Sequence, residues 1–298
     1  MISLREYLDT TRCEEPLKDL IELIAYQAIP IREAFLSNQA YAASLNASGE
    51  QQAALDTWSD RHLTNVLQES KLVAELASEE QPDVVRFPGA TTNYAVVMDP
   101  LDGSSLIQVN LAVGTIVGIF GEGGVLQKGE RLRAAMYMLY GPMTVLTITV
   151  GEGVCLFALN EARQYVLLSG GVRMPEGNLY GSGGIRPDWT EAHTACIGQI
   201  EGEGAKLRYS GSFVADFHQI LKYGGVYCYP ALKKKEEGKL RLLFEAIPIG
   251  FIAAQAGGAI SNGRGDILAI EPTAVHQRTP IYVGSSGLIR HIEDLLAR

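Results

Sequence analysis

The sequence predicts a layered α/β sandwich, and three observations lead to this fold class. Stretches with apolar residues at helical spacing alternate in blocks with runs that are rich in β-branched residues. Residues 132–169 consist of short apolar runs separated by turn-forming residues, which predicts an antiparallel sheet. The chain has 298 residues, of which 47% are hydrophobic and 20% are charged, so it has enough apolar material for a large core.

The first half of the chain contains two helical patterns followed by strands. Residues 15–37 carry a helical pattern, and Pro30 is expected to kink or divide that helix because it lacks an N–H group. Residues 49–69 carry a second helical pattern. The runs at 94–99 and 111–120 are β-branched and apolar, which predicts two buried strands ahead of the antiparallel sheet.

A stretch rich in glycine and proline, residues 170–190, predicts the connection between two halves of the chain. We place the boundary between residues 1–175, with a first mixed sheet, and residues 176–298. In the second half the sequence predicts helices at 189–200, 212–222, 248–257 and 285–298, a strand at 226–229, and a strand or the start of a helix at 239–246.

Charge and cysteine usage exclude several classes of protein. A net charge of −9 disfavours nucleic acid and anionic membranes as partners. The four cysteines are scattered and form no CxxC pair, which predicts reduced thiols in a cytoplasmic protein. The N-terminus lacks the apolar core of a signal peptide, and no apolar stretch reaches the ~18 residues of a membrane span.

Two acids stand at the end of an apolar run in VVMDPLDGSSLI, residues 96–107. Pro100 biases Asp99 toward an extended backbone, and the turn that follows can bring Asp99 and Asp102 toward one point. Carboxylates that lie close together repel one another, and a divalent cation such as Mg²⁺ or Mn²⁺ removes that conflict. The backbone N–H groups of the following Gly-Ser-Ser would suit a phosphate, especially at a helix N-terminus. The alternative is an ordinary surface turn, because Asp, Gly and Ser favour turns for local reasons.

Other acids give weaker signals by themselves. Glu79 and Glu80 follow an apolar run, where a metal ligand and a solvated turn are both open interpretations. Glu245 lies between long apolar stretches, so it is either a ligand or a paired core acid. Asp56, on the helical pattern of residues 49–69, reads as a helix-surface acid when taken without further context.

A cationic cluster complements these acids. It comprises Lys233, Lys234, Lys235, Lys239 and Arg241, with Arg208 and Tyr209 upstream. Lys239 and Arg241 alternate into an apolar, strand-like run and are expected to face a cleft, whereas Lys233 and Lys235 also fit a soluble loop. Carboxylates for a metal together with a cationic patch indicate phosphate-ester chemistry.

Four long motifs, taken in order, resemble one known family. They are AELASEE, VVMDPLDGSS, KLRYSGSFVADFHQILKYGGVYCYP and GKLRLLFEAIPIGFIAAQAGG. From about residue 15 to the end, the chain is similar to class I fructose-1,6-bisphosphatases, the sugar bisphosphatase branch of the lithium-sensitive phosphatase superfamily. The inositol monophosphatase branch has a WD-type third motif, where this chain has LLFEAIP. The resemblance implies an α-β-α-β-α sandwich of the sugar phosphatase type.

The resemblance also implies the activity and the residues that carry it. The implied reaction is Mg²⁺-dependent hydrolysis of the 1-phosphate of fructose 1,6-bisphosphate in gluconeogenesis, with two or three metal ions per site. The implied metal ligands are Glu79, Glu80, Asp99, the Leu101 carbonyl, Asp102 and Glu245. Asp56 and Glu80 would activate the water, and Glu50 matches a mobile-loop position usually held by Asp. Substrate contacts would come from Asp102, Gly103, Ser104, Ser105, Tyr209, Tyr229, Lys234, Lys239, Arg241 and, reaching into a neighbouring subunit, Arg208. That last contact implies a homotetramer or a homodimer.

Three departures from the family pattern carry expectations of their own. AMP-inhibited members have a Lys and an Arg where this chain has Asn93 and Gly121, so weak or absent AMP inhibition is expected. A substrate-binding Asn is replaced by Gly183 or Gly184, so one phosphate contact is missing or rebuilt. The stretch DGSSLIQVNLAVGTI is more similar to sedoheptulose-1,7-bisphosphatases, so sedoheptulose 1,7-bisphosphate remains an alternative substrate. A remote alternative is a non-catalytic metabolite-binding regulator, but every expected acid is present.

Overall fold

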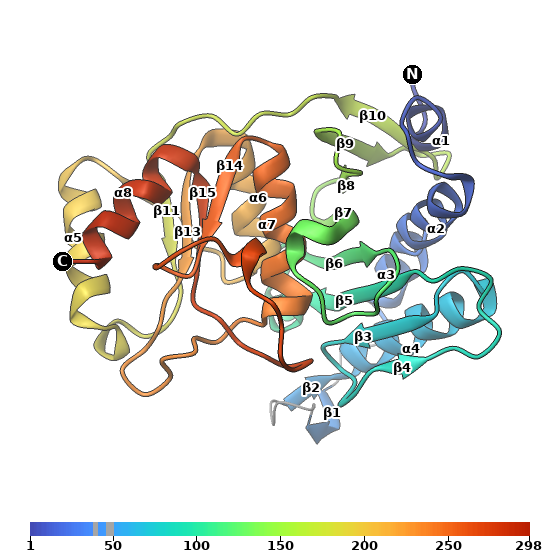
Figure 1. The fold of residues 1–298 in the computed structure, drawn as a ribbon, viewed down its shortest axis with the longest axis horizontal. Helices are drawn as coiled ribbons and strands as arrows, with labels where there is room; N and C mark the ends of the chain where they lie inside the picture. Colours follow the sequence, from blue (N-terminus) through green and yellow to red (C-terminus); the bar gives the residue numbers. More distant parts are fainter. Residues whose placement is uncertain (38–40, 46–50) are drawn as a thin grey trace.

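The computed structural model describes residues 1–37, 41–45 and 51–298, and it confirms the α-β-α-β-α sandwich (Figure 1). One outer layer holds helices α1 (Leu4–Leu8), α2 (Glu15–Ala25), α3 (Ala28–Ala34) and α4 (Ala54–Ser70). Helices α6 (Phe213–Tyr223) and α7 (Ile247–Gln255) lie between the two large sheets, and α5 (Glu191–Gly202) and α8 (Ser286–Leu296) cover the far side.

The larger sheet has eight strands in the order β10-β9-β8-β7-β6-β5-β3-β4. These strands are β3 (Glu75–Ser78), β4 (Val85–Arg86), β5 (Ala95–Asp102), β6 (Val113–Phe120), β7 (Leu132–Tyr140), β8 (Thr144–Thr149), β9 (Val154–Leu159) and β10 (Tyr165–Ser169). Neighbours are antiparallel except for β3 and β5, which are parallel. The two expected buried strands and the antiparallel sheet at 132–169 are therefore confirmed.

The smaller sheet has five strands in the order β12-β11-β13-β15-β14. They are β11 (Leu179–Ser182), β12 (Lys206–Leu207), β13 (Gly225–Tyr229), β14 (Gly258–Ser261) and β15 (Ile281–Ser285). A separate pair, β1 (Tyr41–Leu45) and β2 (Gln51–Ala53), precedes α4. The helix expected over 49–69 therefore begins only at Ala54, because the residues before it form β2.

Helix boundaries follow local chemistry. The helix expected over 15–37 is divided as predicted, but the break falls between Ala25 and Ala28. Pro30 lies in the first turn of α3, where its missing N–H group costs no intrahelical hydrogen bond. Ser212 caps α6 by accepting a hydrogen bond from the N–H of Ala215.

Helix α7 has the composition that its place in the middle layer requires. It contacts strands of both sheets, and its residues from Ile247 to Ala253 are all buried. A helix that is apolar on all sides is stable only when it is covered on all sides. No helix among the described residues has the length and apolar character needed to cross a membrane.

Candidate active site

The first two acids are brought together by a break in strand pairing. The β5–β6 register shifts between Asp99 and Asp102, and Pro100 between them has no N–H group for the ladder. In a regular strand, residues three apart face opposite sides of the sheet. The irregularity re-aims the strand end, so that Asp99 and Asp102 line one cavity. The side-chain hydroxyl of Thr115 donates to the Pro100 carbonyl at 2.8 Å and holds this bend.

Glu79 reaches the same place because β3 lies beside β5. The two strands are parallel, so their carboxyl ends meet at one edge of the sheet. The N–H of Glu79 donates to the Met98 carbonyl at 3.1 Å, which fixes Glu79 next to the end of β5.

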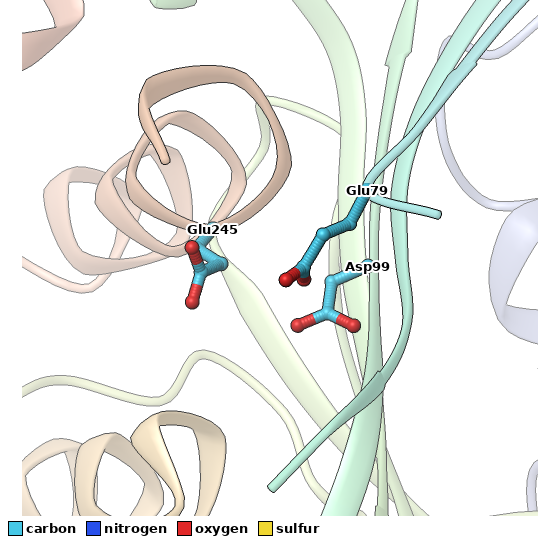
Figure 2. Close-up of side chains that lie close together, drawn as sticks. All are labelled: Glu79, Asp99 and Glu245. Atoms are coloured by element: carbon cyan, nitrogen blue, oxygen red, sulfur yellow. The ribbon is translucent and has the colours of Figure 1, made fainter. Parts of the chain in front are cut away.

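Glu245 approaches from the other half of the chain. It lies in a π-helical turn, Leu242–Ala246, immediately before α7. Figure 2 shows its carboxylate facing those of Glu79 and Asp99. One carboxylate oxygen of each of these three residues lies within 4.8 Å of those of the other two. Acids that are 166 positions apart in the sequence thus form one cluster.

Burial and mutual repulsion disfavour charge in this cluster. Burial, followed by the neighbouring acids, raises the pKa of Asp99 well above its usual value. Burial likewise raises the pKa of Glu245 to about 8, against the opposing effect of Arg241. Burial raises the pKa of Asp102 to about 6, although two hydrogen bonds to its carboxylate oppose this shift.

Arg241 compensates part of the negative charge. Its side chain is only 3% exposed, and Nη1 forms an ion pair with Glu79 Oε1 at 2.5 Å. Its backbone N–H donates to Glu245 Oε2 at 2.6 Å. We expected Arg241 at the sugar-phosphate end of the site; here it lies among the acids.

The turn after β5 requires glycine. Gly103 has φ +80°, and a Cβ there would lie 2.8 Å from the Cβ of Ser212. A short 3₁₀ helix, Ser104–Val109, follows this turn. The hydroxyl of Ser104 donates to Asp56 Oδ2 at 3.0 Å, and Asp56 is only 9% exposed. The interpretation of Asp56 as a helix-surface acid is therefore wrong, because α4 turns this residue toward the Ser104 turn.

The N-terminus of α6 holds Asp102. The hydroxyl of Ser212 donates to Asp102 Oδ2 at 2.7 Å, and the N–H of Val214 donates to the same oxygen at 2.9 Å. An orphan N–H group at a helix N-terminus is a favourable partner for a carboxylate. Ser212 was not anticipated as a site residue. Its position as a Ser at the start of the helical pattern of residues 212–222 was the available signal.

Most of the expected site residues line one cavity of about 240 Å³. Those that line it are Asp56, Glu79, Glu80, Asp99, Leu101, Asp102, Gly103, Ser104, Ser105, Tyr209, Tyr229, Lys239, Arg241 and Glu245. Gly211, Phe213, Tyr227 and Leu240 also line it and were not anticipated. One cavity is thus lined by acids together with hydroxyl groups, a lysine, an arginine and aromatic rings.

Among the described residues, two that were expected in the site do not line this cavity. Arg208 is exposed, and its guanidinium lies 5.8 Å from the centre of the Tyr223 ring. Lys234 is exposed on its loop. Glu50 lies outside the described residues. The strand-like alternation through Lys239 and Arg241 is also not borne out, because a single bridge from Arg241 to Arg278 precedes the π-helical turn.

Gly183, one of the two glycines expected in place of a substrate-binding Asn, has no room for a side chain. A Cβ at Gly183 would lie 2.4 Å from ring atoms of Tyr229 and 3.1 Å from the hydroxyl of Tyr209. The Tyr229 ring therefore occupies the space that a side chain at position 183 would need.

Comparison with known proteins places the chain in a family. Residues 13–169 match the family model "Fructose-1-6-bisphosphatase, N-terminal domain", and residues 174–297 match "Fructose-1-6-bisphosphatase, C-terminal domain". The chain belongs to the fructose-1,6-bisphosphatase family. It is 63% identical over 295 residues to a class 1 fructose-1,6-bisphosphatase of Methanocorpusculum labreanum, covering 99% of this chain and 92% of that one. It is 56% identical over 296 residues to the class 1 fructose-1,6-bisphosphatase of Methanospirillum hungatei, covering 99% and 95%.

A solved fructose-1,6-bisphosphatase has the same fold. The holo form of the Leishmania major fructose-1,6-bisphosphatase superposes with a TM-score of 0.95 at 30% identity, covering 99% of both chains. The T-state of the Leishmania major enzyme gives a TM-score of 0.90 at 29% identity. The resemblance drawn from the four sequence motifs is confirmed at the level of family and fold.

Proposed function

We propose that this chain hydrolyses the 1-phosphate of fructose 1,6-bisphosphate to give fructose 6-phosphate and acts in gluconeogenesis. The observation that carries this proposal is the convergence of Glu79, Asp99 and Glu245 in the cavity that the Ser104 turn also lines. Membership of the fructose-1,6-bisphosphatase family supports the substrate.

The donor set of the acid cluster fits Mg²⁺ or Mn²⁺. All donors are oxygens, as these hard cations prefer. Burial, followed by repulsion from neighbouring acids, raises the pKa values of Asp99 and Glu245, and a bound cation would offset the charge that both effects disfavour. We assign as ligands Glu79, Glu80, Asp99, the Leu101 carbonyl, Asp102 and Glu245, for two or three ions. When bound, such ions lower the pKa of a coordinated water and offset charge on the phosphoryl oxygens.

Protein groups would orient the reacting atoms. Asp56 and Glu80 line the cavity and would accept or direct the proton of the attacking water. The backbone N–H groups of Ser104 and Ser105 would donate to the phosphate, whose equatorial oxygens gather charge in the transition state. Glu50 is proposed as a further contributor from the family's mobile-loop position.

The remaining substrate contacts are assigned to other residues that line the cavity and to a second subunit. Tyr209, Tyr229 and Lys239 line the cavity and would hold the sugar and its distal phosphate. Arg208 is exposed and does not line this chain's own cavity, which is compatible with its reaching a neighbouring site in a homotetramer or homodimer. Lys234 is proposed as a further contact to the sugar or its distal phosphate. Sedimentation analysis tests this assembly: a fully active monomer would contradict it.

The division into residues 1–175 and 176–298 remains our proposal. The eight-stranded sheet is built from strands before residue 175, and the five-stranded sheet from strands after it, which supports this boundary. All four cysteines are free thiols, which supports a cytoplasmic location.

Phosphate release in the presence of Mg²⁺ tests the function. The purified protein is assayed with fructose 1,6-bisphosphate, sedoheptulose 1,7-bisphosphate and inositol 1-phosphate side by side. We expect the highest kcat/KM with the first substrate. A higher value with the seven-carbon sugar would assign the alternative activity, and no Mg²⁺-dependent release from any of them would refute the proposal.

A further inference from the structure

Helix α4 offers a second buried acid, one helical turn after Asp56. Asp60 is 5% exposed and does not line the cavity. Its Oδ1 accepts a hydrogen bond from the hydroxyl of Ser78 at 2.6 Å, and its Oδ2 accepts one from the side-chain amide of Gln81. The Asp60 carboxylate therefore accepts hydrogen bonds from both residues that flank the pair Glu79 and Glu80.

The turn at residues 78–81 is also fixed internally. The N–H of Glu80 donates to the hydroxyl of Ser78 at 3.4 Å, and the N–H of Gln81 donates to the Ser78 carbonyl at 3.1 Å. The Ser78 hydroxyl thus links the backbone of Glu80 to Asp60. A shift of the Asp60 side chain would be transmitted directly to the backbone that carries the two glutamates.

A histidine from the other half of the chain holds the opposite side of this turn. The Nε2–H group of His276 donates to the Gln81 carbonyl at 2.7 Å. The His276 ring lies edge-on to the Phe244 ring, with centroids 5.4 Å apart. Phe244 directly precedes Glu245 in the π-helical turn, so the contact ties the turn at 78–81 to the segment that supplies Glu245.

We propose that Asp60 and His276 are positioning residues that clamp the turn at residues 78–81 and thereby set the distance from Glu79 and Glu80 to Glu245. The inference rests on the proposed function, because it assigns the clamp to a site for divalent cations. Neither residue is among those that line the cavity, so each acts through the turn. Partners that orient metal-binding side chains typically change metal affinity or activity by 10–100-fold when they are removed.

The test compares two substitutions of Asp60 with a matched control. Asp60→Ala removes both acceptors. Asp60→Asn removes the charge but keeps an oxygen for Ser78, and the Gln81 amide can reverse to accept from the new amide. Ser59→Ala is the control, because the Ser59 hydroxyl is buried on the same helix and has no hydrogen-bond partner among the described residues.

Two readouts are used: the half-saturating Mg²⁺ concentration for phosphate release, and calorimetric binding of Mn²⁺ to the metal-free protein. We expect Asp60→Ala to weaken both about tenfold or more, Asp60→Asn to stay within about threefold of the wild type, and Ser59→Ala to leave both unchanged. Wild-type Mn²⁺ affinity in Asp60→Ala would overturn the clamp. Equal weakening in Asp60→Asn would also overturn it, because the charge and not the hydrogen bonds would then matter.

Two further variants keep the test decisive if Asp60→Ala does not fold. Ser78→Ala removes the hydroxyl between Asp60 and Glu80, and His276→Phe keeps the ring against Phe244 but removes the N–H group that binds Gln81. Both should weaken Mn²⁺ binding severalfold, and wild-type binding by both would refute the clamp. If the wild type releases no phosphate while the Mn²⁺ pattern holds, the proposed function fails and the clamp stands.

Discussion

Replacing Ser212 with alanine tests how the acid cluster is held in place. The Ser212 hydroxyl donates to Asp102 Oδ2 at 2.7 Å and accepts a hydrogen bond from the N–H of Ala215 at the start of α6. Ser212→Ala removes both bonds but keeps the Cβ that packs against Gly103. The variant therefore isolates the hydroxyl from the packing of the turn.

The expected loss combines two contributions. An N-cap contributes about 1 kcal/mol to the free energy of unfolding. A hydrogen bond to a charged group contributes about 1.5–3 kcal/mol. At pH 8 the Asp102 carboxylate is ionised, because burial raises its pKa only to about 6. We therefore expect Ser212→Ala to lower the free energy of unfolding by about 3 kcal/mol at this pH.

A second cap supplies the matched control. Thr190 caps α5 by accepting a hydrogen bond from the N–H of His193 at 3.2 Å, and it contacts no member of the acid cluster through that hydroxyl. Thr190→Ala should cost about 1 kcal/mol. Denaturant unfolding measures both variants, and phosphate release measures turnover, which should fall about tenfold or more in Ser212→Ala alone. Equal losses of stability in the two variants, or wild-type turnover in Ser212→Ala, would refute this reasoning.

Three further predictions concern the acids, pH and a nucleotide. Asp102→Ala should lower kcat with saturating Mg²⁺ by about 100-fold or more, because it removes a proposed ligand; a normal rate with normal Mg²⁺ dependence contradicts that assignment. Burial lowers the pKa of His193 from 6.5 to about 4, so the unfolded chain binds more protons between these values. The contribution of His193 to the free energy of unfolding should fall by about 3 kcal/mol as the pH drops from 6.5 to 4. In denaturant titrations His193→Gln should remove this part of the pH dependence; an unchanged slope counts against it. Sub-millimolar AMP should not inhibit, given Asn93 and Gly121; strong inhibition in an AMP titration would show this expectation to be wrong.

The strands and the acid turn were predictable because their signals are local. A short run of apolar, β-branched residues predicts a strand that is buried on both faces. Strands β5 and β6 are such runs, and both are buried at every position. Asp99 and Asp102 could be predicted as site residues because they come directly after such a run. The long motifs then added Glu79 and Glu245, which no local pattern could place beside them.

The parts that escaped prediction depend on contacts between distant segments. Asp60 reads as a polar residue on a helix, and only the fold places Ser78 against it. His276 carries no local signal at all, because its partner Gln81 lies 195 residues earlier. The stretch at 239–246 was left open between a strand and the start of a helix because alternation over a few residues fits either conformation, and the structure shows the start of a helix.

The origin of the acid cluster in two halves also affects how the chain matures during synthesis. Glu79 and Asp99 leave the ribosome well before Arg241 and Glu245, which lie in the last quarter of the chain. At ordinary elongation rates this interval is on the order of ten seconds. During that time a nascent chain holds neither the guanidinium of Arg241 nor the carboxylate of Glu245, so the acid cluster is complete only when translation is nearly finished.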